Sequence, residues 1–241
     1  MAREAVKAWT GGGEGAALAP ASWPGLPERP ARAQLRLRML EAMLEVTGEM
    51  GYEQVAVRHV VERARSSRAT FYKHFEGKDD CFAKAYEEAS EWLYRRVVGE
   101  AARQPGWREG LRAGLAELLE FCAGRPALAR ALFVEVHAAD ERARARRAEL
   151  MRRFAAALDS ARDERPDRSP PRVTGEFMVG AIENLISAKL MAGDAASARD
   201  LLPGLLHFVV MQYYGEEAAW EEMTAAPLAT WSARRAAAAG I

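Results

Sequence analysis

The stretch of sequence that decides the fold is Ser67-Arg68-Ala69-Thr70-Phe71-Tyr72-Lys73-His74-Phe75, in a chain of 241 residues. Its aromatic residues Phe71 and Phe75 are four positions apart, so in a helix they share one face, and we expect both to be buried. The other side chains are small or carry hydrogen-bond donors. A helix that is anchored by aromatics and presents small and basic groups on its other face suits the major groove of DNA.

The residues before this stretch predict a second helix packed beside it. Its apolar positions follow the i, i+3, i+4, i+7 spacing of one helix face: Val57, Val60, Val61 and Ala64. A short turn at Arg65 and Ser66 follows, and Ser67 suits the N-cap of the next helix. Two helices joined by so short a turn, at about 56–75, predict a helix-turn-helix motif whose second helix enters the major groove.

Positive charge is concentrated around this motif, although the chain as a whole has a formal net charge of zero. Between residues 54 and 78 the acids are Glu62 and Glu76, whereas the basic residues number six: Arg58, Arg63, Arg65, Arg68, Lys73 and Lys78. This local surplus of four charges indicates affinity for phosphates through counterion release. Any nucleic-acid surface is therefore local to this segment.

Four ordered motifs carry a family resemblance: Gly51-Tyr52, Val57-Arg58-His59-Val60, the stretch 67–75, and Gly77-Lys78-Asp79. Through them, residues 31–98 closely resemble the N-terminal domain of the TetR family of bacterial transcriptional regulators. The rest of the chain resembles the family only in being helical and in total length. The resemblance implies an all-α protein with an N-terminal three-helix helix-turn-helix DNA-binding domain and a larger C-terminal helical domain for ligand binding and dimerisation.

The resemblance also implies roles for individual residues. Tyr72 and Lys78 would contact phosphate oxygens, and Arg68 would make the bidentate contact with a guanine edge. Ala69 and Thr70 would meet a thymine methyl group. The expected DNA-contacting set is completed by side chains near the backbone or the base edges: Arg58, Ser67, Lys73 and His74.

Two positions depart from the family pattern. The family usually has Gly and then a hydrophobic residue in the turn, where this chain has Arg65 and Ser66. A residue other than glycine in the left-handed region costs on the order of 1 kcal/mol, so either the turn differs or Arg65 tolerates the strain. The family often places Thr where Ala56 stands, and alanine can neither cap the second helix nor donate to a phosphate.

Residues 1–30 are rich in Gly, Pro and Ala and predict a disordered N-terminal arm. Beyond it we expect a DNA-binding domain at 31–98 and a regulatory and dimerisation domain at 99–241. Apolar periodicity and breaks at Pro and Gly predict helices at 31–50, 57–64, 67–75, 78–98, 107–123, 126–138, 140–164, 172–192, 196–214 and 216–238. No segment alternates with period two for long enough to predict a sheet.

The composition excludes several classes of protein. The two cysteines, Cys81 and Cys122, give no disulfide framework and no metal-ligand spacing. No signal peptide is recognisable, and no apolar run approaches the ~18 residues of a membrane span. We therefore expect a cytoplasmic, nucleoid-associated protein that does not bind membranes. Glu135 and His137 are two residues apart and face different sides of a helix, so we expect no metal site, and we expect no cofactor and no catalytic group.

In the family, two long C-terminal helices usually build a two-fold dimer, and 172–192 and 196–214 are the matching pair. The expected interface residues are Phe177, Ala181, Asn184, Leu185 and Ala188 on the first helix and Leu206, Val209, Val210 and Tyr213 on the second. The same stripes would also suit the domain's own core. Dimerisation is the preferred interpretation, because a two-fold operator needs two recognition helices roughly 34 Å apart.

The ligand pocket would lie among the helices at 107–164 and the start of 172–192. Its expected lining is aromatic and sulfur-containing: Trp107, Phe121, Phe133, His137, Met151, Phe154, Phe177 and Met178. This lining favours a small hydrophobic ligand. The arginines at 142–153 are expected to form a solvated helix face paired with Glu141 and Glu149.

The sequence thus predicts a homodimeric, ligand-responsive transcriptional regulator, most simply a repressor of a palindromic operator, and not an enzyme. One alternative is a DNA-binding regulator that is controlled by a protein partner and has no small-molecule pocket. The other is a helical ligand carrier or enzyme with an incidental helix-turn-helix. The basic surplus at 54–78 and the absence of catalytic groupings argue against the second.

Overall fold

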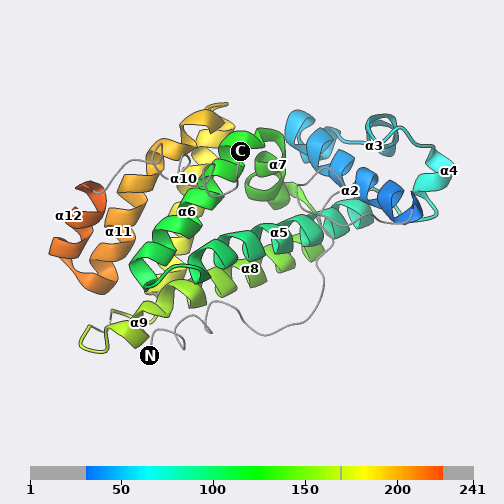
Figure 1. Ribbon diagram of the computed structural model, residues 1–241. Helices are drawn as coiled ribbons and strands as arrows, with labels where there is room; N and C mark the ends of the chain where they lie inside the picture. The colour runs from blue at the N-terminus through cyan, green and yellow to red at the C-terminus, as the bar shows by residue number, and fades with distance from the viewer. Residues whose placement is uncertain (1–30, 169, 225–241) are drawn as a thin grey trace.

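The computed structural model describes residues 31–168 and 170–224, and within these ranges the chain is helical with no strand (Figure 1). This confirms the predicted all-α fold. The expected arm at 1–30 and the last part of the expected helix at 216–238 lie outside the described residues. In the part that is described, no helix combines the length and the apolar character that a membrane crossing requires.

A small N-terminal unit lies at one end of the molecule (Figure 1). Its elements are α2 (Ala31–Met50), the 3-10 turn η1 (Tyr52–Gln54), α3 (Val57–Arg63) and α4 (Arg68–Phe71). Gly51 directly follows the end of α2, and its φ of +87° is a backbone conformation that L side chains rarely adopt. The amide of Gly51 still donates to the carbonyl of Thr47 at 2.9 Å, so the chain turns sharply without leaving the end of the helix unbonded.

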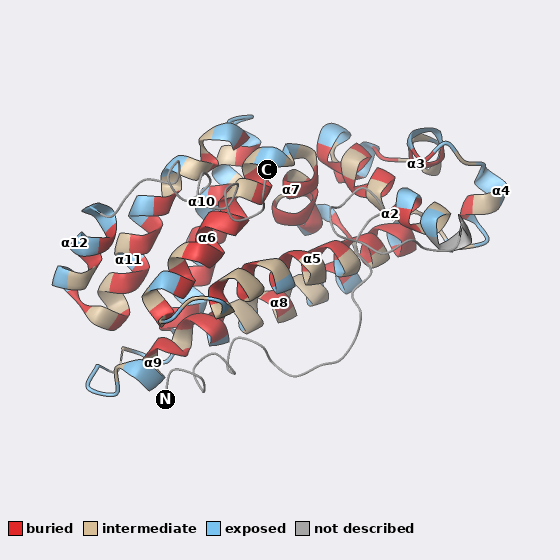
Figure 2. Cartoon of the chain, in the orientation of Figure 1, coloured by how far each residue is buried: buried red, intermediate tan, exposed pale blue. Residues whose placement is uncertain are grey.

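The long helix α5 (Lys78–Ala102) runs from this unit into the larger one and is packed by both (Figure 1). The larger unit contains α6 (Trp107–Gly124), α7 (Pro126–Phe133), η2 (Glu135–Ala138), α8 (Glu141–Asp159), α9 (Ala161–Glu164), α10 (Thr174–Met191), η3 (Ala195–Leu201), α11 (Leu202–Tyr214) and α12 (Glu216–Thr224). The buried residues form a continuous core through both units (Figure 2).

Several expected helices are divided or shortened. The expected helix at 126–138 becomes α7 and η2, the one at 140–164 becomes α8 and α9, and the one at 196–214 begins as the 3-10 helix η3. Helix α4 ends at Phe71 instead of continuing to Phe75, because the next amides bond three residues back: Lys73 donates to Thr70 at 3.2 Å and His74 to Phe71 at 2.9 Å. Apolar spacing alone does not distinguish these tighter turns from α-helix.

Two glycines allow helices to touch backbone to backbone. A Cβ placed on Gly48 of α2 would lie 1.8 Å from the carbonyl oxygen of Ala127 at the start of α7. A Cβ on Gly114 of α6 would lie 3.2 Å from the carbonyl oxygen of Val97 on α5. The first contact ties the small unit to the larger one, and the second brings α6 close against α5.

The arginines of α8 hold this helix to its neighbours. Glu91 of α5 receives Arg146 at 2.8 Å and Arg153 at 2.5 Å, and Glu183 of α10 receives the Nε of Arg147 at 2.7 Å. We expected these three arginines to lie on a solvated face and to pair with acids of their own helix. They pair instead with Glu91 of α5 and Glu183 of α10. Their partners are far away in the sequence, so helical spacing gives no sign of them.

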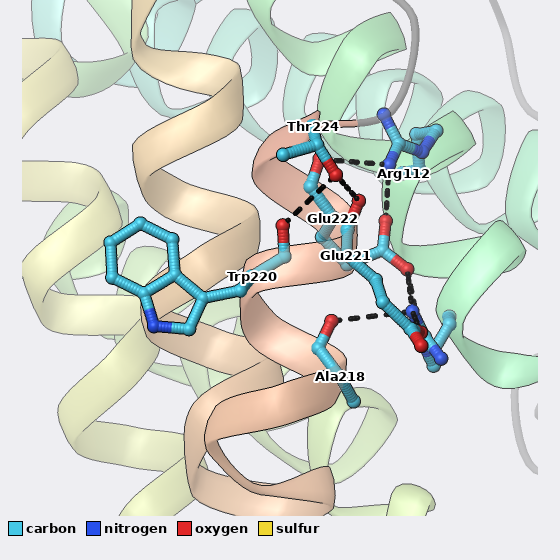
Figure 3. A network of polar contacts seen from close by, with 7 residues as sticks. Arg112, Ala218, Trp220, Glu221, Glu222 and Thr224 are labelled. Carbon is cyan, nitrogen blue, oxygen red and sulfur yellow. Dashed lines mark hydrogen bonds and ion pairs between the residues drawn. The ribbon is translucent and has the colours of Figure 1, made fainter.

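Helix α12 is clamped onto α6 by a network of ion pairs (Figure 3). The buried Glu222 receives Arg108 at 2.8 Å and also pairs with Arg112, while Arg108 reaches Glu221 at 2.9 Å. Trp220 extends from the opposite side of α12 (Figure 3). Its ring lies 4.7 Å from that of His207 on α11. The clamp thereby presents Trp220 on the outer surface, where it is 52% exposed.

Candidate nucleic-acid interface and internal cavity

The two aromatic residues of the deciding stretch are core anchors, as predicted. Phe71 is 0% and Phe75 2% exposed, and their ring centroids lie 5.2 Å apart. The rings attach the segment to the small unit because both face inward from one side of α4 and the turn after it. The remaining side chains are left to face outward.

The turn before α4 resolves the question that Arg65 raises. Its φ is 49°, and it is the one non-glycine residue with positive φ in the described part of the chain. The amide of Ser66 then donates to the carbonyl of Val61 at 2.8 Å, and the Ser67 hydroxyl accepts from the Thr70 amide at 3.1 Å. Arg65 therefore occupies the left-handed position that the family fills with glycine, and Ser67 caps α4 as predicted.

Ala56 provides no side-chain cap for α3, as predicted, but a second contact at this helix start was not predicted. The ring Nδ1 of His59, the third residue of α3, accepts the Ala56 amide at 3.2 Å, which is one half of a capping box. The signal was present in the sequence, because an acceptor three residues into a helix can reach back to the N-cap amide.

The outward face of this motif carries most of the predicted DNA-contacting residues. Exposed are Arg58, Ser67, Arg68, Ala69, Tyr72 and Lys73, while Thr70, His74 and Lys78 are half-buried. Tyr72 is 58% exposed, which is far too open for a residue whose role is packing alone. No described residue forms an ion pair with Arg68 or Lys73, so both charges are available to an incoming phosphate or base.

Two basic residues of the motif are engaged within the chain. Arg63 pairs with Glu45 at 2.9 Å and Glu49 at 2.5 Å on α2. The ammonium of Lys78 donates to the carbonyl of Tyr52 at 3.2 Å and lies 4.3 Å from the centre of its ring. Arg63 is therefore a structural residue, whereas Lys78 retains further N–H groups because an ammonium has three donors.

A carboxylate behind the motif fixes the loop that follows it. Asp80 of α5, only 8% exposed, accepts the Glu76 amide at 3.1 Å and the Lys84 ammonium at 2.8 Å. Burial pushes the pKa of Asp80 upward, but these two hydrogen bonds outweigh burial and hold the pKa below its ordinary value. The charged form of Asp80 therefore stabilises the connection between the motif and α5.

The larger unit contains a half-open apolar cavity of about 60 Å³. It lies among α5, α6, α7, α8 and α10. Ring and thioether groups line it from Phe133, Met151 and Phe154, which are three of the eight residues expected to do so. The remaining lining was not predicted. Most of it is aliphatic and cannot be distinguished from core by residue type: Val97, Leu111, Gly114, Leu115, Leu118, Ala157, Leu158, Val179, Ile182 and Ile186. Glu183, whose carboxylate pairs with Arg147, completes it.

The structure places the other five expected pocket residues elsewhere. Trp107 packs against Tyr213 and Tyr214 with ring centroids 5.4 and 5.5 Å away, and Phe121 lies against Trp92. The other three are also outside the cavity: Met178 is buried, whereas His137 and Phe177 are exposed. For Phe177 the reason is its helical phase, because Val179, Ile182 and Ile186 turn the opposite face of α10 inward.

Large apolar side chains are exposed mainly at the C-terminal end of the described chain. Seven of the nine in the described residues lie on or beside α10, α11 and α12: Val173, Phe177, Leu185, Met191, Phe208, Trp220 and Met223. The predicted interface residues of α10 are all on this exposed face: Phe177, Ala181, Asn184, Leu185 and Ala188. Clustered exposed apolar residues mark interaction surfaces.

The predicted interface residues of α11 require a correction. Leu206, Val209, Val210 and Tyr213 are at most 1% exposed, so they belong to the chain's own core. Helix α11 is apolar on nearly every side, and the sequence therefore does not reveal which face turns inward. The outward face carries Phe208, which is 64% exposed.

A helix-turn-helix with an exposed, basic outer face, joined to a larger helical unit, is the arrangement typical of DNA-binding transcriptional regulators. In a comparison with protein families, residues 39–85 match the family described as "Bacterial regulatory proteins, tetR family". This match confirms the resemblance to the TetR family that the sequence motifs of this segment predict. Comparison with curated protein sequences gives no match.

Solved structures share the fold across most of their length. The fatty acid degradation regulator FadR from Bacillus halodurans has a TM-score of 0.66 at 14% identity, covering 76% of this chain and 97% of its own. FadR from Bacillus subtilis in complex with stearoyl-CoA has a TM-score of 0.64 at 18% identity, covering 74% and 98%. SmeT, the repressor of the Stenotrophomonas maltophilia multidrug efflux pump SmeDEF, has a TM-score of 0.60 at 17% identity, covering 74% and 89%.

Proposed function

We propose that the protein is a homodimeric, ligand-responsive repressor that binds a palindromic DNA operator. The observation that carries the proposal is the exposed face of α4 and the turn after it. There, Arg68 and Lys73 have no ion-pair partner among the described residues, and Tyr72 is 58% exposed. Arg68 reads a guanine edge, and Tyr72 and Lys78 fix the register on phosphates. The DNA-binding domain is 31–98 and the regulatory domain 99–241, with α5 belonging to both.

The exposed apolar face of α10 supports the homodimer. Phe177 and Leu185 on α10 and Phe208 on α11 are open to solvent in the single chain, and burying them favours association. A two-fold axis through this face presents two copies of α4 to successive turns of the DNA. SmeT is a repressor, and repression is the simplest consequence of occupying an operator.

The cavity supports control by a small apolar ligand rather than by a protein partner. Its lining is apolar apart from Glu183, whose carboxylate pairs with Arg147. The FadR structure from Bacillus subtilis holds stearoyl-CoA, so a long acyl chain is the first ligand to test. A ligand in this cavity favours a dimer state whose recognition helices are wrongly spaced for the operator. Because linkage is reciprocal, ligand and DNA weaken each other's binding by the same factor.

A gel shift at moderate salt tests the DNA-binding part, with the DNA directly upstream of the protein's own gene and variants of it as probes. The wild type is expected to discriminate between the variants. Arg68→Ala is expected to lose about tenfold to a hundredfold of that discrimination, because a bidentate base contact is worth about 1–3 kcal/mol. Arg103→Ala, which removes a remote surface charge on α5's C-cap, serves as the control. If Arg68→Ala lowers the affinity for all DNA variants by the same factor, Arg68 does not read a base.

A second gel shift tests the ligand part with stearoyl-CoA as the probe. Its addition is expected to weaken operator binding, and the operator is expected to weaken stearoyl-CoA binding, measured by calorimetry, by an equal factor. Binding of stearoyl-CoA with no effect on DNA affinity contradicts control through this cavity.

A further inference from the structure

A second connection, separate from α5, joins the cavity to the DNA-binding unit. Helix α7 contributes the ring of Phe133 to the cavity at its C-terminal end. Near its N-terminal end, the carbonyl of Ala127 lies against Gly48 of α2 so closely that a Cβ there would be 1.8 Å away. A single short helix therefore contacts the cavity and the backbone of the DNA-binding unit.

Immediately after α7, Glu135 makes a specific contact with the DNA-binding unit. Its side chain is buried, and its Oε2 accepts the backbone amide of Tyr52 at 2.9 Å across 83 residues of sequence. Its Oε1 accepts the Nε of Arg130, on α7, at 3.0 Å. One carboxylate thus links α7 to the turn between α2 and α3.

Tyr52 is in turn connected to the residues that face DNA. Its carbonyl accepts from the ammonium of Lys78, and its hydroxyl donates to Asp79 at 2.6 Å. Both partners are in the first turn of α5, directly after the helix-turn-helix motif. The preceding Gly51, with φ of +87°, directs the Tyr52 amide toward Glu135. A change at Glu135 therefore reaches Lys78 through one residue.

From these contacts we infer that Glu135 is a positioning residue through which α7 sets the orientation of the DNA-binding helices relative to the cavity. The regulatory part of this inference rests on the proposed ligand-responsive function. A displacement of α7 by about 1 Å takes the 2.9 Å hydrogen bond beyond bonding distance. Leaving a buried carboxylate and a buried amide without hydrogen-bond partners costs free energy. The contact between Glu135 and Tyr52 therefore favours two distinct arrangements of α7 over a continuous range of positions.

A double-mutant cycle on DNA affinity tests the inference without any ligand. Ala157→Leu fills part of the cavity in place of a ligand, because Ala157 lines it. Glu135→Leu removes the acceptor for the Tyr52 amide. The dissociation constant for the upstream DNA fragment is measured by fluorescence anisotropy for the wild type, both single variants and the double variant, and far-UV circular dichroism confirms that each is folded.

We expect Ala157→Leu to weaken DNA binding at least fivefold in the wild-type background and less than twofold in the Glu135→Leu background. Glu135→Gln, which keeps one oxygen to accept the Tyr52 amide, should restore most of the fivefold effect. If Glu135 had a merely structural role, the effects of the substitutions at positions 157 and 135 on the dissociation constant would be independent. In that case Glu135→Gln would behave like Glu135→Leu. Independent effects, or no effect of Ala157→Leu in either background, overturn the inference.

Stearoyl-CoA then separates the inference from the proposed function. If stearoyl-CoA weakens DNA binding by the wild type but the effects at positions 157 and 135 are independent, the positioning role of Glu135 is wrong and the ligand proposal stands. If the two positions are coupled but stearoyl-CoA does not bind, the positioning role of Glu135 stands and stearoyl-CoA is not the ligand. Glu149→Gln, an exposed change on α8, is the matched control and should leave both measurements unchanged.

Discussion

Replacing Gly48 by alanine tests the backbone contact between α2 and α7. The new Cβ would lie 1.8 Å from the Ala127 carbonyl oxygen, whereas real Cβ atoms essentially never come under 3.0 Å, so the helices must separate by at least the 1.2 Å difference. Neither atom belongs to a side chain that can rotate away. Overpacking of this kind costs about 1–3 kcal/mol, and alanine returns about 0.5–1 kcal/mol of helix propensity.

The expected result is a net loss of about 1–2 kcal/mol in the free energy of unfolding, or roughly 2–8 °C in Tm. Urea unfolding followed by circular dichroism measures it, with all samples at one protein concentration because association shifts apparent stability. Gly99→Ala in α5 is the control: nothing lies within 4 Å of its Cβ position, so it should stabilise by about 0.5–1 kcal/mol. Stabilisation by Gly48→Ala as well would refute the close contact.

Three further predictions concern the turn, the loop behind the motif and the dimer. Arg65→Gly should raise the free energy of unfolding by about 0.5–1 kcal/mol, because relief of left-handed strain exceeds the added entropy of the unfolded chain, and unchanged urea unfolding would contradict this. Asp80→Asn should lower stability at pH 7. The pKa of Asp80 in the folded chain lies below its unfolded value of about 3.9. The contribution of the charged carboxylate to the free energy of unfolding is therefore complete above that value and is lost as the pH falls through the folded pKa. The difference in free energy of unfolding between wild type and variant, measured by urea titration, should shrink below pH about 4. A difference that persists undiminished at pH 3 would be inconsistent with a charged Asp80. Phe208→Asp should weaken self-association at least tenfold in sedimentation equilibrium while leaving the monomer folded, and an unaltered dimer would place the interface elsewhere.

The N-terminal unit was predictable because its signals are local. Phe71 and Phe75 at a spacing of four, Ser67 as a cap and Gly51 as a helix end each act within a few residues, and all four behave as expected. Helix boundaries there were correct to within a few residues except at α4, where the change to three-residue hydrogen bonding leaves no mark on apolar spacing.

The cavity and the dimer face were less predictable, because they depend on which side of an apolar helix turns inward. Leu206 and Phe208 are two residues apart on α11, yet one is 0% and the other 64% exposed. Residue type gives no reason to separate them. For the same reason the sequence places Phe177 in the pocket, although its side of α10 faces outward.

The hydrogen bond between Glu135 and Tyr52 could not be predicted from residue spacing. The two residues are 83 positions apart, and the local sequence around Glu135 indicates only that it and His137 face different sides of a helix. Its actual role depends on Gly51 and Gly48 allowing α2 and the turn after it to approach α7 closely. Such contacts join segments that are distant in the sequence, and the residue pattern of one segment gives no information about the other.

Sequence-specific DNA binding is tested most directly by a selection from a pool of random double-stranded DNA with the purified protein at moderate salt, followed by sequencing. We expect enrichment of a two-fold repeat whose half-sites lie about one helical turn or a multiple of it apart. Arg68→Ala should lose the preference at one position of each half-site. No enrichment by the wild-type protein above the starting pool would contradict sequence-specific DNA binding by α4.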